Sequence, residues 1–427
     1  MQKKGLLITA VLFSFFFSVM TPVQAQDTTP AKEKVVISIN LAFTGPYKDQ
    51  SEEQLKAYQL AIETINAQGG ILGKSIVAEV NDSFTKATLA ADNAKKAIEE
   101  KGAVMIIGGC SSSEAVALAD LAQEKKVIFL PGVTNSNAIT GFDIDAKTGQ
   151  TTRQVANRYT FRWFNNAWMT ARALSKYLTV KLGTQAKYYY IVADYTWGHS
   201  IEKSMRQALE SAGSTTLEAV RVPMGTENFS QYLLKVKEAK PDALILGLYG
   251  KDMINCLKQA TAFGIKENIK IIVPVIESNM AKSTGPESLK GIIGSIPWYW
   301  SLKDTYKGSK ELYDKFTSKY GLTPCANSAV AWTTLLEYAD AVKRAGTFEA
   351  KAVIKALENH KFVLLKGEEY WRDWDHQGIN SVIIVEGKGP GEQTNENDVF
   401  KIVDEIPGAI IAPTQEDNPV IWTEKLE

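Results

Sequence analysis

The feature that most constrains this chain is the alternation of short apolar runs with segments of helical periodicity, which occurs in two successive halves. Strand and helix patterns at this spacing are typical of βαβ units, so the sequence predicts an α/β fold with parallel sheets. In the first half we expect strands at 35–43, 76–80, 104–107 and 127–130, and helices at 54–67, 88–100 and after residue 113. In the second half we expect strands at 188–193, 217–222, 243–248 and 271–276, and helices at 201–212, 229–239 and 253–263.

The remaining segments are less regular. A polar stretch at 135–158 interrupts the alternation, and we place the first domain crossover at its end. After the second half we expect a strand near 292–296, helices at 310–320, 330–345 and 348–357, and a strand at 382–386. The chain from residue 387 onward is rich in Gly, Pro, Asn and Glu, so we expect a loosely attached tail.

Residues 1–25 have the pattern of an export signal. Lys3 and Lys4 precede an apolar run at 6–19, and small residues suit signal peptidase, so we expect cleavage near Ala25/Gln26. The apolar run is too short for a comfortable membrane span, and no later uncharged apolar run reaches about 18 residues. No cysteine lies near the cleavage site, so a free periplasmic protein is the simplest interpretation.

The bulk composition narrows the class of protein further. Removing 25 residues from 427 leaves 402, which predicts two domains of ordinary size. The leader takes two lysines from 48 basic residues, leaving 46 against 48 acidic residues and a net charge of −2. This balance gives no indication of a nucleic-acid or anionic-membrane partner. The chain has three cysteines, an odd number that cannot all pair, and all three lie in apolar or turn contexts: Cys110, Cys256 and Cys325. We therefore expect mostly buried free thiols, with one bridge possible.

The turn after the strand at 104–107 is the first candidate binding site. Two glycines end the strand, and Ser111 followed three residues later by Glu114 fits a capping box. A helix N-terminus at the carboxyl end of a parallel strand has unpaired N–H donors and a partial positive charge, which attract a carboxylate. Ser112 and Thr134 fall at the same sheet edge. The alternative is that Ser111 only caps the helix and Thr134 only forms a turn, and the local sequence leaves both interpretations open.

The second half offers facing candidates. Tyr195, Trp197 and Tyr249 lie in loops directly after buried strands, where core packing explains large aromatic residues less easily than on a helix face. Glu277 follows another apolar run and is a natural partner for a ligand ammonium, although a solvated loop acid or a helix cap is the alternative. Trp298 could line a pocket or pack between the halves, and we expect the pocket.

Enzyme motifs are incomplete. Residues 69–75 imitate a phosphate-binding loop without its glycine spacing, and the Ser111 turn lacks the final glycine of a nucleophile elbow. His199, His360 and His376 are not at metal-ligand spacing from one another, so we expect no metal, no cofactor and no histidine-based triad. A serine hydrolase using Ser111 stays as the weakest alternative, because no base can be named.

Several short motifs occur in a fixed order along the chain. They are residues 44–46 (TGP), 65–71 (INAQGGI), 108–113 (GGCSSS), 158–162 (RYTFR), 194–198 (DYTWG) and 375–377 (DHQ). With them the chain resembles, over about 35–385, the branched-chain-amino-acid-type solute-binding proteins of ABC transporters, a group that includes leucine/isoleucine/valine-binding proteins and their amide, urea and aromatic-acid relatives. The resemblance implies two Rossmann-like lobes with parallel-type sheets joined by a three-stranded hinge, the periplasmic binding protein type I fold. The implied division is 26–158 and 295–365 for lobe 1, 159–294 and 366–390 for lobe 2, and 391–427 for the tail.

The resemblance also implies roles for individual residues. In the leucine-binding relatives, positions matching Ser111 and Thr134 hold the ligand carboxylate and ammonium, with backbone groups between them. An aromatic position matches Tyr249, and the ammonium-binding acid falls near Glu277. The full predicted ligand-binding set is Ser111, Ser112, Gly132, Val133, Thr134, Tyr195, Trp197, Tyr249, Glu277 and Trp298.

These observations combine into one expected function. We expect a monomeric substrate-binding component of an ABC importer that captures a small amino acid or related carboxylate or amide solute and delivers it to membrane permease subunits. We expect neither enzymatic activity nor nucleic-acid binding. The alternative from a different functional class is a ligand-binding sensor or regulatory domain of the same fold. The sequence leaves the solute open among aliphatic amino acids, aromatic acids, amides and urea.

Overall fold

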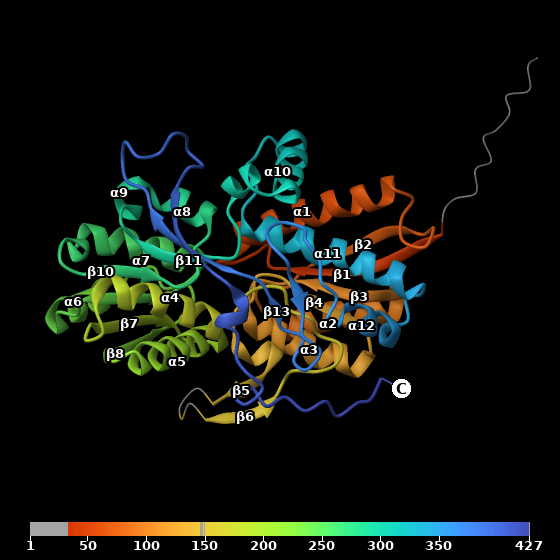
Figure 1. The fold of residues 1–427 in the computed structure, drawn as a ribbon, viewed down its shortest axis with the longest axis horizontal. Helices are drawn as coiled ribbons and strands as arrows, with labels where there is room; N and C mark the ends of the chain where they lie inside the picture. Colours follow the sequence, from red (N-terminus) through yellow and green to blue (C-terminus); the bar gives the residue numbers. More distant parts are fainter. Residues whose placement is uncertain (1–32, 146–147, 149, 427) are drawn as a thin grey trace, which may run out of the picture. The chain divides into compact units, whose positions relative to one another are not determined.

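Two β-sheets organise residues 33–145, 148 and 150–426, which are the residues that the structure, a computed structural model, describes (Figure 1). The predicted leader and its cleavage site lie outside these residues. The first sheet has the order β2-β1-β3-β4 with every pair parallel, as predicted. Its strands are β1 (Lys34–Leu41), β2 (Ser75–Asp82), β3 (Ala103–Gly108) and β4 (Ile128–Pro131), and the connecting helices are α1 (Lys48–Ala67), α2 (Ala87–Lys101) and α3 (Ser112–Lys125).

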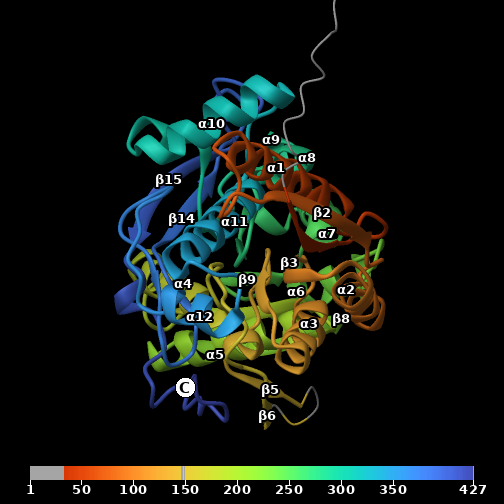
Figure 2. The ribbon, with the colours of Figure 1, turned by 90° about the vertical axis from the view of Figure 1, so that its right-hand side faces the viewer.

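The central strands of this sheet are buried almost throughout, because helices cover both faces. Right-handed crossovers place α1 on one face and α2 and α3 on the other. In agreement, α2 packs against α3, whereas α1 packs against the later helix α11 (Ala326–Ala345) (Figure 2). The carboxyl ends of β1, β3 and β4 therefore meet at one open edge.

The second sheet has seven strands in the order β15-β14-β11-β10-β9-β7-β8. Neighbouring pairs from β8 to β11 are parallel, and β14 and β15 extend the sheet antiparallel. The strands are β7 (Lys187–Ala193), β8 (Thr215–Val222), β9 (Ala243–Gly247), β10 (Lys270–Val273), β11 (Ile293–Ile296), β14 (Val382–Gly387) and β15 (Phe400–Ile406). The helices are α4 (Ala167–Leu182), α5 (Thr196–Ser211), α6 (Ser230–Ala239), α7 (Gly250–Ala262), α8 (Ser278–Thr284) and α9 (Pro286–Leu289).

Up to strand β14, the chain passes between the two α/β lobes three times. It leaves the first sheet after residue 158, returns after β11 to form α10 (Lys307–Tyr320), α11 and α12 (Ala350–Leu357), and crosses again to reach β14. Bridges link Phe129 to Thr160 and Arg162 to Gln377, so the crossover segments run beside each other. The Arg162 side chain is fully buried, and its Nε donates to Gln377 Oε1 at 2.9 Å. This arrangement is the predicted two-lobed fold with a hinge.

Two details of the predicted lobe boundaries differ. The strand β11, which includes Ser295 and Ile296, pairs with β10 and β14 in the second sheet, so lobe 1 resumes after residue 296 rather than at 295. Bridges from Glu358 to Trp371 and from Phe362 to Glu369 keep that segment beside the end of α12. The third crossover therefore begins later than residue 366.

The C-terminal segment is not the loosely attached tail that its composition suggested. Strand β15 pairs with β14 along its whole length and forms the edge of the second sheet. Farther on, the Arg172 guanidinium meets Asp417, and Glu424 accepts hydrogen bonds from Tyr159 and Gln123. The segment thus runs from the second lobe back to the first.

Three other elements had no clear signal in the sequence. The helix α4 lies in a stretch for which we predicted no element, whereas the hairpin of β5 (Phe142–Ile144) and β6 (Thr151–Gln154) and the short helix α8 fall where we predicted a break and a loop. The helix α4 begins at an Asn166 cap, whose side-chain oxygen accepts from the Met169 N–H.

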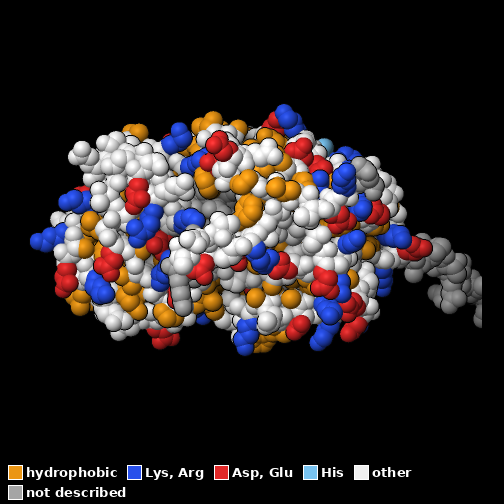
Figure 3. All heavy atoms as spheres, turned by 90° about the horizontal axis from the view of Figure 1, so that it is seen from below, with side chains coloured by type: hydrophobic (Ala, Val, Ile, Leu, Met, Phe, Trp, Pro, Cys, Tyr) orange, Lys and Arg blue, Asp and Glu red, His pale blue; other side chains and the backbone are white. Residues whose placement is uncertain are grey.

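The charge distribution on the surface and the state of the cysteines agree with the balanced charge and the buried free thiols expected from the composition. Basic and acidic side chains are interspersed over the face shown in Figure 3. Cys110, Cys256 and Cys325 are all buried and all free. Among the described helices, none combines the length and the apolar character needed to cross a membrane.

Candidate functional site

The turn between β3 and α3 presents an unpaired hydroxyl at the open edge of the first sheet. Gly108 and Gly109 adopt φ of 108° and 100°, a region that favours glycine. They bring the chain to Ser111, the N-cap of α3. The Ser111 N–H donates to the Glu114 carboxylate at 3.3 Å, which is one half of the predicted capping box. The other half is only a loose contact, because the buried Ser111 Oγ has no hydrogen-bond partner among the described residues.

The loop after β4 supplies a second unpaired hydroxyl. The Gly132 N–H donates to Gly108 O at 2.9 Å, and a Cβ at Gly132 would lie 2.5 Å from Gly109 O, so the two turns touch. Thr134 follows and is fully buried, and within the described chain its Oγ1 has no hydrogen-bond partner. The two hydroxyls therefore lie on adjacent turns at the carboxyl ends of neighbouring strands.

Aromatic side chains of the second lobe face these turns. Tyr195 and Tyr249 are the N-cap residues of α5 and α7, and Trp197 lies in the first turn of α5. The Trp197 ring lies 6.2 Å from that of Tyr249, and its Nε1 donates to Asn135 Oδ1 in the first lobe at 2.9 Å. Tyr47 of the first lobe donates from its hydroxyl to that of Tyr195 at 2.9 Å. The two lobes thus meet through an aromatic cluster.

Glu277 adds a buried acid to this wall. It is the N-cap of α8, it is fully buried, and neither carboxylate oxygen has a hydrogen-bond partner in the described part of the chain. Burial raises its pKa to about 8, and the nearby N–H of Ala326 opposes this rise. Burial, followed by the Glu277 charge, also raises the pKa of Tyr249. The pKa of Cys110, beside Ser111, is raised to about 12 by burial, with Glu277 among the smaller causes. The acid therefore lies within electrostatic reach of both the aromatic cluster and the Ser111 turn.

Between these walls lies a cavity of about 10 Å³, roughly the room for one water molecule. Its lining comes from both lobes and from the first crossover: Val133, Asn135, Phe164, Trp197, Tyr249 and Val275. The walls are thus nearly in contact, and a solute of amino-acid size requires the lobes to separate before it can enter.

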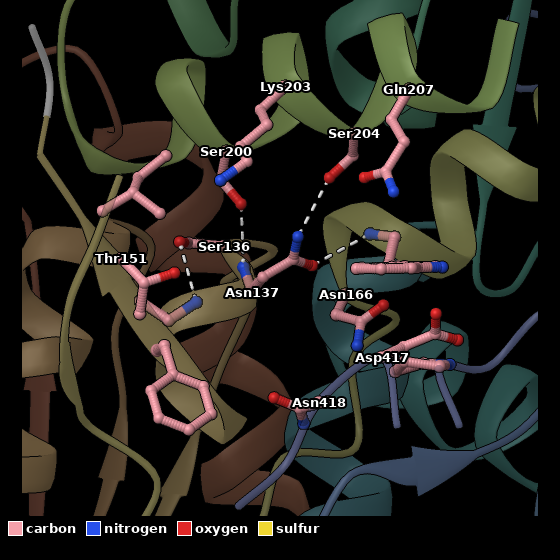
Figure 4. Close-up of a pocket in the computed structure, with 15 residues that line it drawn as sticks. Ser136, Asn137, Thr151, Asn166, Ser200, Lys203, Ser204, Gln207, Asp417 and Asn418 are labelled. Atoms are coloured by element: carbon pink, nitrogen blue, oxygen red, sulfur yellow. Dashed lines mark hydrogen bonds between the residues drawn. The ribbon is translucent and has the colours of Figure 1, made fainter. Parts of the chain in front are cut away.

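Hydrogen bonds outside this cavity also join the lobes. The Ser113 and Thr196 hydroxyls lie 2.9 Å apart. Asn137 donates from its backbone to Ser200 Oγ and from its side chain to Ser204 Oγ, both at 2.9 Å (Figure 4). A neighbouring polar cavity of about 280 Å³ lies beside these residues.

The structure does not bring every predicted residue together. The Trp298 indole N–H donates to Ser309 Oγ at 2.7 Å, and the ring is fully buried, a contact that fits the packing alternative. The lining of the 10 Å³ cavity includes Val133, Trp197 and Tyr249 of the predicted set, but not Ser111, Ser112, Gly132, Thr134, Tyr195, Glu277 or Trp298. The Ser112 hydroxyl accepts from the Ser136 N–H at 3.2 Å and so holds the loop after β4. Tyr47, which contacts Tyr195, was not among the predicted residues, although its position in the loop after β1, at the same sheet edge, was a usable signal.

No serine-hydrolase arrangement surrounds Ser111 in the described residues. Each histidine ring has a carboxylate neighbour elsewhere: His199 with Asp194, His360 with Asp340, and His376 with Glu358. Glu114 accepts from the Ser111 backbone rather than from its hydroxyl. The site can hold polar groups, but these contacts do not activate a nucleophile.

Comparisons with known proteins agree with this geometry. The "Leu/Ile/Val-binding protein homolog 7" of Brucella abortus is 24% identical to this chain and covers 77% of it and 82% of its own length. The "Leu/Ile/Val-binding protein" of Citrobacter freundii is 22% identical, covering 70% and 76%.

The fold has close counterparts among solved structures. A periplasmic binding protein from Burkholderia mallei superposes with a TM-score of 0.83 at 24% identity, covering 92% of this chain and all of the other. An amino acid ABC transporter substrate-binding protein from Pseudomonas fluorescens gives a TM-score of 0.80 at 23% identity, covering 88% and 96%. The family model described as "Periplasmic binding protein" matches residues 34–393. This chain therefore belongs to the periplasmic binding protein family.

Proposed function

We propose that this protein is the solute-binding component of an ABC importer and that it captures a small carboxylate carrying an amine, such as an amino acid, between its lobes. The observation that supports this most strongly is the set of buried, unpaired groups Ser111 Oγ, Thr134 Oγ1 and the Glu277 carboxylate. A buried polar group without a partner costs roughly 1–3 kcal/mol. A ligand with a carboxylate at one end and an ammonium beside it supplies partners for all three.

The charge distribution supports the same orientation. The hydroxyls of Ser111 and Thr134 and the N-terminus of α3 suit a carboxylate, which helix N–H groups and the helix dipole stabilise. Glu277 is the acid of the opposite wall, so the ammonium is placed there. Tyr249 and Trp197 are left to contact the remainder of the solute.

Export and delivery follow from the same proposal. Residues 1–25 would direct the chain to the periplasm and be removed near Ala25/Gln26, and the closed form would dock on permease subunits as a monomer. Several relatives and solved neighbours are named for leucine, isoleucine and valine binding or as ABC transporter proteins, and these names support this role. Intact-mass measurement of the exported protein checks the cleavage site.

Binding is tested by titrating the mature protein with the proteinogenic amino acids, using a thermal-shift screen followed by calorimetry. We expect at least one to bind, and we expect Ser111→Ala to weaken that binding by about ten- to a hundredfold, the effect of losing a charge-assisted hydrogen bond. Unchanged affinity in Ser111→Ala would mean that the hydroxyl only caps the helix.

A further inference from the structure

A second cluster of functional side chains lies on the first lobe, away from the cleft. Glu337 and Asp340 are three residues apart on α11 and so share one helix face, and His360 follows α12. His360 Nε2 lies 3.6 Å from Asp340 Oδ2 and 4.0 Å from Glu337 Oε2, and one ligand atom from each residue lies within 4.8 Å of the others. We propose that these three side chains bind a divalent transition-metal ion, with zinc the best match.

The backbone positions His360 for this role. The helix α12 ends at Leu357, and Asn359 adopts φ of 58°, in the left-handed region. The Asn359 N–H donates to Trp371 O at 2.8 Å, which fixes the turn. The turn directs the next side chain, His360, back over α11. Because 31% of its side chain is exposed, a metal held there could keep an open position toward solvent.

Glu337 is the observation that points to a ligand rather than to a surface acidic patch. It is 5% exposed, and its Oε2 faces His360 without a hydrogen-bond partner in the described structure. Burial raises its pKa to about 8, and the neighbouring Asp340 carboxylate contributes. A buried carboxylate is stabilised only by a proton, a hydrogen-bond donor or a cation. A metal ion between Glu337, Asp340 and His360 would meet that need.

The surrounding charges fit a cation with one imidazole and two carboxylate ligands. A neutral imidazole has a lone pair for coordination, and Nε2 is the ring nitrogen of His360 that faces both carboxylates. The Arg344 Nε donates to Asp340 Oδ2 at 2.7 Å and orients that carboxylate so that the same oxygen, which has a second lone pair, faces His360 Nε2 at 3.6 Å.

The donor set and distances favour zinc. Zinc accepts mixed nitrogen and oxygen ligands at about 2.0–2.2 Å, which places tetrahedral ligand atoms about 3.3 Å apart. The observed separations of 3.6 and 4.0 Å need only a small contraction, which the partly exposed Asp340 and His360 can provide. Along α11, Glu337 is about 16 Å from Ala326 at the cleft, so the metal would not contact the solute.

The test titrates chelator-treated, tag-free mature protein with zinc chloride by calorimetry. We expect one zinc ion per chain, and we expect Glu337→Gln and His360→Gln each to weaken binding at least tenfold, since removing even an outer-shell partner costs about 10–100-fold. His199→Gln is the matched control, because His199 pairs with Asp194 at 2.7 Å but belongs to no three-residue cluster found in the described chain.

Two outcomes would overturn the proposal: no zinc binding by the wild type, or equal binding by wild type and His360→Gln. Thermal unfolding of each variant separates loss of the site from loss of the fold. Cobalt(II) substitution adds a spectroscopic check, since a tetrahedral site gives visible absorption that His360→Gln should abolish. Solute binding is expected to survive Glu337→Gln, so this test and that of the proposed function fail independently.

Discussion

At the residue scale, the proposed role of Glu277 predicts that solute binding is coupled to proton release. Its pKa of about 8 in the folded protein exceeds the usual value of 4.5. The ligand-free folded state therefore keeps a proton that the unfolded state loses, and the free energy of unfolding falls as pH rises from about 4.5 to 8. An ammonium ligand needs the carboxylate form, so binding below pH 8 releases a proton.

Calorimetry in two buffers of different ionisation enthalpy measures this release. We expect up to one proton released per amine-bearing solute bound at pH 7, and none from this site in Glu277→Gln. Affinity should also weaken as pH falls below 8, by at most about tenfold per unit. A buffer-independent binding enthalpy at pH 7 would contradict the assignment of Glu277.

Thr134 distinguishes a ligand-binding hydroxyl from a structural one. Thr134→Val keeps the shape and removes an Oγ1 that has no partner in the described structure. We therefore expect the ligand-free protein to gain up to about 1 kcal/mol in free energy of unfolding, while solute affinity falls about tenfold. Urea unfolding and calorimetry measure the two effects, and a loss of stability with unchanged affinity would assign the hydroxyl to the fold.

At the element scale, the turn from β3 to α3 depends on two adjacent glycines for different reasons. Both have φ near 100°, but a Cβ at Gly108 would lie 2.6 Å from Asn40 O, whereas a Cβ at Gly109 would have no heavy atom within 4 Å. Gly109→Ala should therefore cost only backbone strain, about 1–3 kcal/mol. Gly108→Ala should lower the free energy of unfolding by more than this, because its Cβ also collides with Asn40 O. Urea unfolding of the two variants decides this, and equal losses would contradict the steric argument.

The sequence predicted most elements because their signals are local. Apolar runs and glycine turns marked β1, β3 and β9, and the pair of Ser111 and Glu114 marked the start of α3. Strand β15 was missed because its burial alternates poorly and its pairing partner β14 supplies the stabilisation. The third metal ligand, His360, could not be assigned, because only the turn at Asn359 brings it to α11.

The same reasoning applies to the candidate site. Ser111, Thr134, Tyr249 and Glu277 could be proposed from the sequence because each lies two to four residues after a buried strand. Trp298 met a similar criterion, yet its indole N–H is bound to Ser309, a contact that only the tertiary structure reveals.

At the scale of the whole molecule, the C-terminal segment braces the crossover region. The Trp422 ring lies 4.7 Å from that of His376, and the Arg158 guanidinium lies 4.9 Å from its centre. Trp422→Ala should lower the free energy of unfolding by about 1–2 kcal/mol through lost packing and cation–π contact. The neighbouring Ile421 is 72% exposed, so Ile421→Ala is the control and should change stability by less than about 0.5 kcal/mol. If Trp422→Ala and Ile421→Ala lowered the free energy of unfolding equally in urea, the C-terminal segment would have no bracing role.

The central claim is that the two lobes hold the two ends of one solute, with Glu277 on the amine. The most direct measurement compares wild type and Glu277→Gln in calorimetric titrations with the amino acid that binds best and with its analogue lacking the amine. We predict that the substitution weakens the affinity for the amino acid at least tenfold and changes the affinity for the analogue by no more than about twofold. Equal effects on both ligands, or no effect on the amino acid, would contradict it.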